Sequence, residues 1–305
     1  MRNSRWFWGV ALALLFALSL GGLGSVYAAG KTLYPERIVS LGPALTEELY
    51  LLGAGDRLVG CTTYCLWPPE ARKKEKVGTV VEVDVERVLA LRPDLVLATS
   101  LTDPRDVKKM RELGLRVVVF PQPKSFGDLC RQFLLLGRLV GREGKAREVV
   151  TRVQEGVKRI EAAVEGLPRP RVFVEIGVRP LFTATGDSFI NDFIKMAGGI
   201  NIAAHARNGL YSREKVLEAN PDVILIVTMG IVGQKEKKAW EEFKTIRAVR
   251  EGRIYVVDSY KLCSPTPVTF VEFLGKLARL LHPGLEGKAL NTWPGERGQG
   301  GSLGR

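Results

Sequence analysis

A short pattern of apolar and polar positions occurs twice along the chain, at a constant offset of 128 residues. Residues 84–100 read DVERVLALRPDLVLATS, and residues 212–228 read SREKVLEANPDVILIVT. Each copy opens on a residue suited to capping a helix, Asp84 or Ser212, and its helical pattern stops before an X-Pro pair. A nearly uninterrupted apolar run follows, as is typical of a parallel strand covered on both faces. Each copy therefore predicts a short helix, a turn and a buried strand.

The duplication continues on both sides of this repeated stretch. Upstream lie the apolar segments 37–41 and 171–177, each followed by a helical pattern that ends in small residues. Downstream lie the apolar segments 116–120 and 253–257. Strand–helix alternation that is repeated in this way predicts two similar α/β lobes, and the chain is long enough for each to have its own core.

Between the lobes the apolar positions change to helical spacing. This pattern runs from Ser125 to about Leu167, and Gly141 and Gly144 interrupt it, so it can form two helices. A helical connector between two lobes is the simplest interpretation. The Gly-rich end of the chain has little apolar content, and we expect it to be disordered.

The first residues show the pattern of an export signal. Arg2 and Arg5 precede an apolar run, and small or apolar residues near Ala28 fit a signal-peptidase site after it. The alternative is an uncleaved anchor helix, because residues 6–28 are just long enough to span a bilayer. We expect an exported protein, periplasmic or at the cell surface. The predicted organisation is a signal peptide (1–28), an N-terminal lobe (29–123), a helical connector (124–170), a C-terminal lobe (171–283) and a disordered tail (284–305).

Charge and metal-binding residue types exclude several classes of protein. The formal net charge of +12 falls to +10 without Arg2 and Arg5, a balance that suits an anionic ligand or membrane surface. No basic patch interleaved with aromatics occurs, so nucleic acid is a poor fit. The 4 cysteines lack the paired CxxC spacing of a zinc site, and 2 histidines argue against a multi-histidine site, so we expect no intrinsic metal.

The residue patterns of common enzymes are absent from the sequence. It contains no GxSxG elbow, no HExxH helix and no phosphate loop of the GxxxxGK[ST] kind. Asp187 and Asp192 could act as acid and base, but their position where a loop meets a helix favours capping. We therefore expect no catalytic residues.

The loops that follow the strands carry the candidate ligand-binding residues. Ligands of parallel α/β sheets bind beyond the carboxyl ends of the strands, and clefts between domains are preferred sites. Aromatic side chains there can stack on a flat or bulky ligand, and Arg and Lys can meet carboxylates or phosphates. Their alternative role is to cover the ends of each lobe's core. The candidates in these loops are Pro43, Tyr64, Trp67, Arg179, Phe182, Asn208, Tyr211, Tyr260 and Lys261.

From about residue 36 to 283 the chain resembles the substrate-binding proteins of ABC importers for cobalamin, haem and ferric siderophores, the class III periplasmic binding proteins. The motifs that carry the resemblance include RIVSLGPALTE, VERVLALRPDLVLA and SREKVLEANPDVILI. The resemblance implies an α/β fold of two Rossmann-like lobes with central, mainly parallel sheets, joined by one long helical connector. It also implies a monomeric, non-enzymatic receptor without a cofactor of its own, which delivers its ligand to an ABC permease dimer with ATPase subunits.

Within this family the chain is most similar to cobalamin binders. The loop CTTYCLWPP resembles their Tyr-containing loop before a Pro-Pro pair, and VRPLFT resembles their loop with a ligand-contacting Phe, which match Tyr64 and Phe182. Val80 stands where those proteins can carry a Trp, the loop at Tyr211 is shorter than theirs, and Asp258 keeps a contact position. The resemblance therefore implies a metal chelate as ligand, a corrinoid first and a ferric siderophore or haem next.

The repeated stretch also contains a candidate docking site. The resemblance implies that one surface glutamate per lobe binds arginines of the permease, and Glu86 and Glu214 match these positions. Each lies in the first turn of its predicted helix, where the helix dipole alone would favour a carboxylate. We expect both to be exposed, on the side of the molecule with the cleft opening.

Two other functions fit parts of the pattern. One is a chelatase-like lyase on a related two-lobed fold, for which His205 is the only histidine in a cleft loop. The other is an extracytoplasmic sensor domain that keeps its N-terminal anchor. The export signal favours capture of a ligand over chelatase chemistry.

Overall fold

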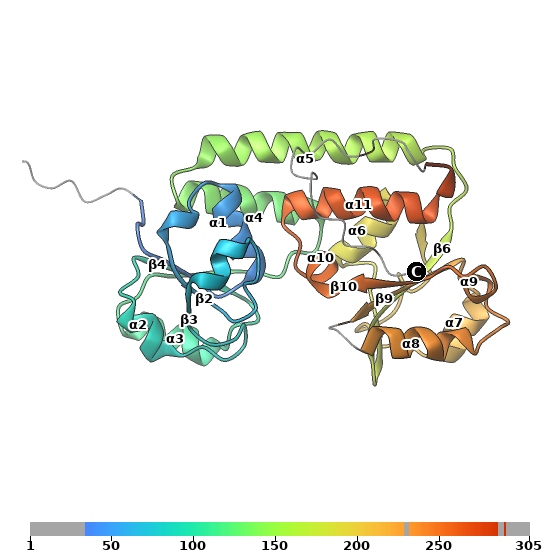
Figure 1. The fold of residues 1–305 in the computed structure, drawn as a ribbon, viewed down its shortest axis with the longest axis horizontal. Coiled ribbons are helices and arrows are strands. Elements are labelled where there is room, and N and C mark those ends of the chain that lie inside the picture. The colour runs from blue at the N-terminus through green and yellow to red at the C-terminus, as the bar shows by residue number, and fades with distance from the viewer. Residues whose placement is uncertain (1–33, 229–231, 286–289, 291–305) are drawn as a thin grey trace, which may run out of the picture. The chain divides into compact units, whose positions relative to one another are not determined.

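The computed structural model describes residues 34–228, 232–285 and 290, which belong to one compact unit. The predicted signal peptide and nearly all of the predicted tail lie outside these residues. Two α/β lobes follow one another along the chain, and long helices run along one side of both, at the top of the view in Figure 1. Within the described residues, no helix combines the length and apolar character needed to cross a membrane.

The N-terminal lobe has a five-stranded parallel sheet with the strand order β3-β2-β1-β4-β5. Strands and helices alternate along the chain as the sequence predicts, and β1 lies at the centre. The elements are β1 (Ile38–Ser40), α1 (Pro43–Leu51), η1 (Gly55–Arg57), β2 (Leu58–Cys61), η2 (Pro69–Lys73), β3 (Glu75–Lys76), α2 (Val85–Ala90), β4 (Leu95–Thr99), α3 (Pro104–Glu112) and β5 (Val117–Phe120).

The helical segment between the lobes consists of two helices. They are α4 (Phe126–Leu139), capped by the Ser125 hydroxyl, and α5 (Glu143–Val164). Gly141 lies between them with a φ of 68°, a left-handed conformation that glycine adopts without steric cost. The interruption of the apolar pattern at this glycine therefore marks a real break between two helices.

The C-terminal lobe has a mixed sheet with the order β10-β9-β6-β7, and β8 pairs with β6. β7 is antiparallel to β6, whereas β8, β9 and β10 run parallel to their neighbours. The elements are β6 (Arg171–Val178), β7 (Leu181–Thr183), α6 (Phe189–Met196), β8 (Ile200–Asn201), α7 (Arg213–Ala219), β9 (Val223–Thr228), α8 (Val232–Glu241), α9 (Arg247–Arg250), β10 (Ile254–Asp258), α10 (Ser259–Cys263), α11 (Pro267–Leu281) and η3 (Pro283–Leu285). The predicted fold class is confirmed.

The repeated stretch forms the same local structure in both lobes. Asp84 and Ser212 cap α2 and α7 by accepting hydrogen bonds from the third residue of the turn, as predicted. Arg92 and Asn220, at equivalent positions, then adopt positive φ angles of 45° and 43°. Both residues precede proline, which disfavours continued helix, so each helix ends in the same abrupt turn.

The aspartate of each Pro-Asp pair fixes the turn to the first strand of its lobe. The Asp94 carboxylate accepts hydrogen bonds from the backbone N–H of Arg37 at 2.9 Å, and Asp222 accepts one from Arg171 at 2.7 Å. These bonds satisfy backbone donors at the start of β1 and β6. The aspartate of the shared Pro-Asp pair thus links the start of β4 to β1 and the start of β9 to β6 by hydrogen bonds.

One hydrophobic core extends through both lobes and the helices between them. It includes Leu49 on α1, Phe133 on α4, Ile160 on α5 and Phe193 on α6, all fully buried. Separate, smaller clusters cover the other face of each sheet. The expectation of one separate core per lobe is therefore only half right, because α4, α5 and α11 join the two inner faces.

Candidate functional site

A cavity of about 820 Å³ is lined by residues of both lobes and of α4. On the N-terminal side it lies beyond the carboxyl ends of β1, β2, β4 and β5, where parallel α/β sheets bind ligands. On the C-terminal side it meets the ends of β6, β9 and β10. Its lining residues are Gly42, Pro43, Ala44, Leu45, Glu48, Tyr64, Leu66, Trp67, Val80, Val81, Thr99, Leu101, Phe120, Pro121, Gln122, Pro123, Leu129, Gln132, Ile176, Val227, Asp258, Ser259, Cys263, Ser264 and Pro265.

The loop after β2 presents aromatic side chains to this cavity. Tyr64 is 52% exposed although its neighbour Cys65 is fully buried. The Cys65 thiol accepts a hydrogen bond from the Thr46 hydroxyl at 3.1 Å, which ties the loop to α1. The Arg72 guanidinium lies 5.4 Å from the centroid of the Trp67 ring, a cation–π contact. The loop thus presents the exposed Tyr64 ring for stacking on a ligand, whereas the half-buried Trp67 ring is already in contact with Arg72.

Five of the predicted ligand-binding residues meet in this cavity. Pro43, Tyr64, Trp67 and Val80 line its N-terminal wall, and Asp258 lines its C-terminal wall. They come from four separate segments of the chain, among them the start of α1 and the end of β10, so only the fold brings them together.

Four other predicted ligand-binding residues do not belong to the described lining of the cavity. Arg179 and Phe182 belong to the β6–β7 hairpin, where the Phe182 ring is 39% exposed. Asn208 lies in the loop before α7 with a φ of 54°. The half-buried Tyr211 ring packs 5.7 Å from that of Phe173, centroid to centroid, under the sheet. The side chains of Tyr260 and Lys261 lie outside the described part of the structure.

Sequence reasoning missed Glu48, which lines the cavity from α1. A signal for it existed, because Leu45, Leu49 and Leu52 form an apolar stripe at helical spacing and Glu48 falls within that stripe. A carboxyl group at such a position is unusual. Glu48 is only 3% exposed, and this burial raises the pKa of its carboxyl group well above the ordinary value.

Charge in the cavity has the opposite sign to that of the whole chain. Glu48 and Asp258 are the charged residue types among its described lining residues, and Lys, Arg and His do not occur there. The Cys263 thiol on the C-terminal wall has its pKa raised to about 11 by burial. The net charge of +12 is therefore no guide to the ligand, and the expectation of an anionic one finds no support in these walls.

The two predicted docking glutamates are both exposed. The Glu86 side chain is 78% exposed, and Glu214 is exposed in the first turn of α7. The helices α2 and α7 that carry them both lie on the side facing away from α5 (Figure 1). A hydrogen bond from Lys109 at 2.9 Å lowers the pKa of Glu86, and hydrogen bonds from its own backbone and Ser212 lower that of Glu214.

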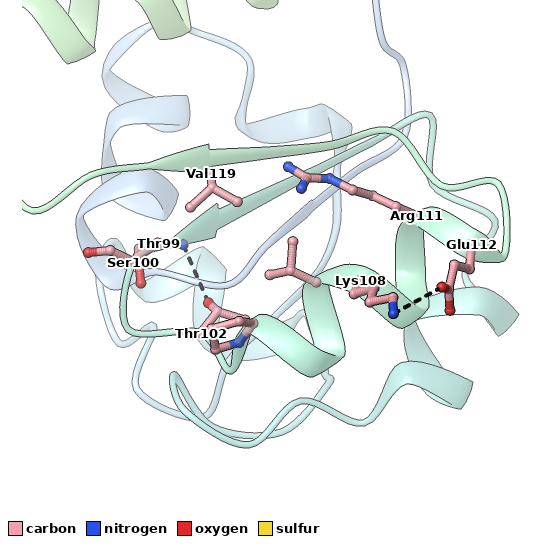
Figure 2. Close-up of a pocket in the computed structure, with 9 residues that line it drawn as sticks. Thr99, Ser100, Thr102, Lys108, Arg111, Glu112 and Val119 are labelled. Carbon is pink, nitrogen blue, oxygen red and sulfur yellow. Dashed lines mark hydrogen bonds and ion pairs between the residues drawn. The ribbon is translucent and has the colours of Figure 1, made fainter.

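A smaller cavity of about 380 Å³ lies between α3 and the edge of the N-terminal sheet. Figure 2 shows contacts between Thr99 and Thr102 and between Lys108 and Glu112. Lys108 pairs with Glu112 at 3.7 Å, and the Arg111 guanidinium donates to the Val117 carbonyl at 3.1 Å. These contacts leave its floor apolar, and we treat it as a surface groove.

The two aspartates considered as acid and base lie outside both cavities. Neither of them occupies the N-cap position of α6, which is held by Ser188. Asp192 instead accepts a hydrogen bond from the Phe126 N–H at 2.9 Å, at the start of α4, and Asp187 accepts one from the Thr185 hydroxyl. His205 is exposed, and the described residues contain no group of three or more metal-ligating side chains.

Two lobes of alternating strands and helices, with a cavity at the strand ends, define a two-lobed binding protein. The sequence matches the periplasmic binding protein family over residues 38–261, and the chain belongs to that family. It is 32% identical over 259 residues to an uncharacterized ABC transporter substrate-binding lipoprotein of Bacillus subtilis, covering 82% of this chain and 81% of the relative. It is 29% identical over 237 residues to a vitamin B12-binding protein of Photorhabdus laumondii, covering 77% and 82%.

Solved structures share the fold. A possible iron-binding protein of Staphylococcus epidermidis superposes with a TM-score of 0.73 at 28% identity, covering 81% of this chain and 99% of the other. The periplasmic vitamin B12-binding protein of Vibrio cholerae has a TM-score of 0.69 at 25% identity, covering 81% and 98%. These proteins are binding proteins of transporters and not enzymes, so the chain is a substrate-binding protein of an ABC transporter, which argues against the chelatase alternative.

Proposed function

We propose that this protein captures a corrinoid such as cobalamin in the cavity between its lobes and delivers it to an ABC permease. The observation that carries the proposal is the wall chemistry: the exposed Tyr64 ring, the half-buried Trp67 ring and apolar side chains, with carboxyl groups and no basic residue among the described lining. The cavity of about 820 Å³ is within the range of small-molecule sites.

Charge separates the candidate ligands. A corrinoid carries neutral primary amides around its ring, which can donate hydrogen bonds to Glu48 and Asp258. Haem carries propionate carboxylates, and the described lining residues include no Lys, Arg or His to pair with them. The described walls thus suit a corrinoid better than haem, and vitamin B12-binding proteins are among the relatives.

Delivery requires export and docking. The apolar N-terminal pattern supports an extracytoplasmic location, and Glu86 and Glu214 supply one exposed carboxylate per lobe for the permease. Charged groups at the rim of an interface mainly steer and orient association. The partner is accordingly an ABC permease dimer with its ATPase subunits.

The test is a titration of protein lacking residues 1–28 with cyanocobalamin, haemin and a ferric hydroxamate siderophore, each followed by visible absorption. We expect one saturable site per chain for cyanocobalamin. Tyr64→Ala should weaken it by the loss of stacking, about 0.5–1.5 kcal/mol or roughly twofold to tenfold. Phe182→Ala serves as the comparison and should cost less, because that ring lies outside the cavity. Saturable binding of haemin alone, or of the siderophore alone, would replace the corrinoid.

A further inference from the structure

The carboxyl group of Glu48 has no partner among the residues that the structure describes. Glu48 is only 3% exposed, and it lines the cavity from the second turn of α1. Within the described part of the chain, no hydrogen-bond donor or cation pairs with its carboxyl group. Buried polar groups in native proteins are almost always paired, so this one calls for an explanation.

Burial without a partner sets the protonation state of this group. An isolated carboxylate is far more costly to bury than a neutral acid, and desolvation together with the charge of Glu47 raises the pKa of Glu48. The other titratable residues of the cavity wall are Tyr64, Asp258 and Cys263, and the Cys130 thiol on α4 lies nearby. Burial raises the pKa of the Cys130 thiol, which is therefore uncharged at neutral pH, so the negative charge of Glu47 is the one that favours the proton remaining on Glu48.

A purely structural role does not account for a carboxyl group here. The apolar stripe of α1 would continue without a break if position 48 held leucine, and leucine would bury no polar atoms. The sequence therefore keeps an unpaired acid in a wall where an apolar residue would fit the fold better.

We propose that Glu48 is a ligand-recognition residue whose neutral carboxylic acid pairs with a primary amide of the bound corrinoid. A carboxylic acid donates its O–H to the amide carbonyl and accepts a hydrogen bond from the amide N–H. The pair satisfies both partners inside the cavity and leaves no buried charge. This inference rests on the proposed function, and it names a primary amide as the group of the ligand that Glu48 recognises.

Three variants test it, with cyanocobalamin as the probe. Glu48→Leu removes both hydrogen bonds, and we expect about tenfold to thirtyfold weaker binding. Glu48→Gln keeps a neutral donor–acceptor group of the same size, and its affinity should stay within about threefold of the original. Glu161→Gln is the control, because this exposed carboxyl on α5 does not line the cavity, and its affinity should not change.

The pH dependence supplies a readout that packing alone would not move. The parent protein should lose affinity as pH rises through the pKa of Glu48, whereas Glu48→Gln should show a flat profile over the same range. Thermal unfolding of each variant, measured without ligand, checks that Glu48→Leu is folded, and we expect it to be at least as stable as the parent.

Each outcome decides the matter. Equal affinity in Glu48→Leu and the parent would remove the recognition role and leave the corrinoid proposal standing. Weak binding in Glu48→Gln as well as Glu48→Leu would show that a charge, not a neutral pair, is required, and would also overturn the inference. No cyanocobalamin binding by the parent protein would overturn both proposals.

Discussion

Burial of Glu175 should make the stability of this protein depend on pH in an unusual direction. Glu175 is on β6, 1% exposed, with one carboxylate oxygen accepting from the Trp240 indole N–H and the other without a partner among the described residues. Desolvation raises its pKa to about 7 from the ordinary 4.5. The folded protein therefore binds this proton more tightly than the unfolded chain does.

The sign and size of the effect follow from that difference. A raised pKa in the folded state contributes stability that is fully present below about pH 4.5 and is lost as pH rises through about 7. The difference between a pKa of about 7 in the folded protein and 4.5 in the unfolded chain corresponds to about 3 kcal/mol of unfolding free energy. The Glu175→Gln variant keeps an acceptor for Trp240 and carries no ionisable group there.

The assay is urea unfolding of both proteins from pH 4.5 to pH 8. We expect the parent to lose about 3 kcal/mol relative to Glu175→Gln over this range, because all other titrating groups are common to the two. Glu218→Gln, which changes an exposed carboxyl on α7, should keep the parent's profile. Parallel pH profiles for the parent and Glu175→Gln would refute the assignment of a raised pKa to this residue.

Three further predictions concern docking, movement and packing. The double variant Glu86→Ala/Glu214→Ala should bind ligand normally and support little transport in vesicles with the permease, because both carboxylates are exposed and remote from the cavity; normal transport would remove their docking role. Small-angle scattering with and without ligand should show only a small change in radius of gyration, since shared helices join the lobes, and a large decrease would contradict this. Phe193→Ala should cost about 3–5 kcal/mol in urea unfolding, because its ring stacks on that of Phe270 at a centroid distance of 3.9 Å; a loss below about 1 kcal/mol would count against that packing.

The fold was largely predictable because its information is local. The caps Asp84 and Ser212 and the X-Pro pairs after the repeat helices could be read directly from the chain. The strands β7 and β8 were missed, since they are only 3 and 2 residues long and gain their structure from pairing with β6. Such short segments carry no periodicity of their own.

The site was less predictable because loops after strands need not turn inward. Tyr64 and Asp258 reach the cavity, whereas Tyr211 turns under the sheet and packs on Phe173. The sequence around Tyr211 does not indicate whether its side chain lines the cavity or packs on the core, because this depends on contacts between segments that are distant in the sequence. Glu48 was hidden for a different reason, since a single carboxyl within a helix is ordinarily solvated and only its place in an apolar stripe distinguishes it.

The core that passes from α1 through α4 and α5 to α6 has a consequence for protein engineering. Although the lobes repeat the same motif, neither carries a complete apolar interior, so a gene cut at the connector would yield two fragments with exposed hydrophobic faces. Each fragment should aggregate when it is expressed alone, and the folded protein should form only when the two are co-expressed, as with split reporters. A fluorescent domain inserted to sense ligand would therefore be placed better in a surface loop such as that at Gly114 than between the lobes.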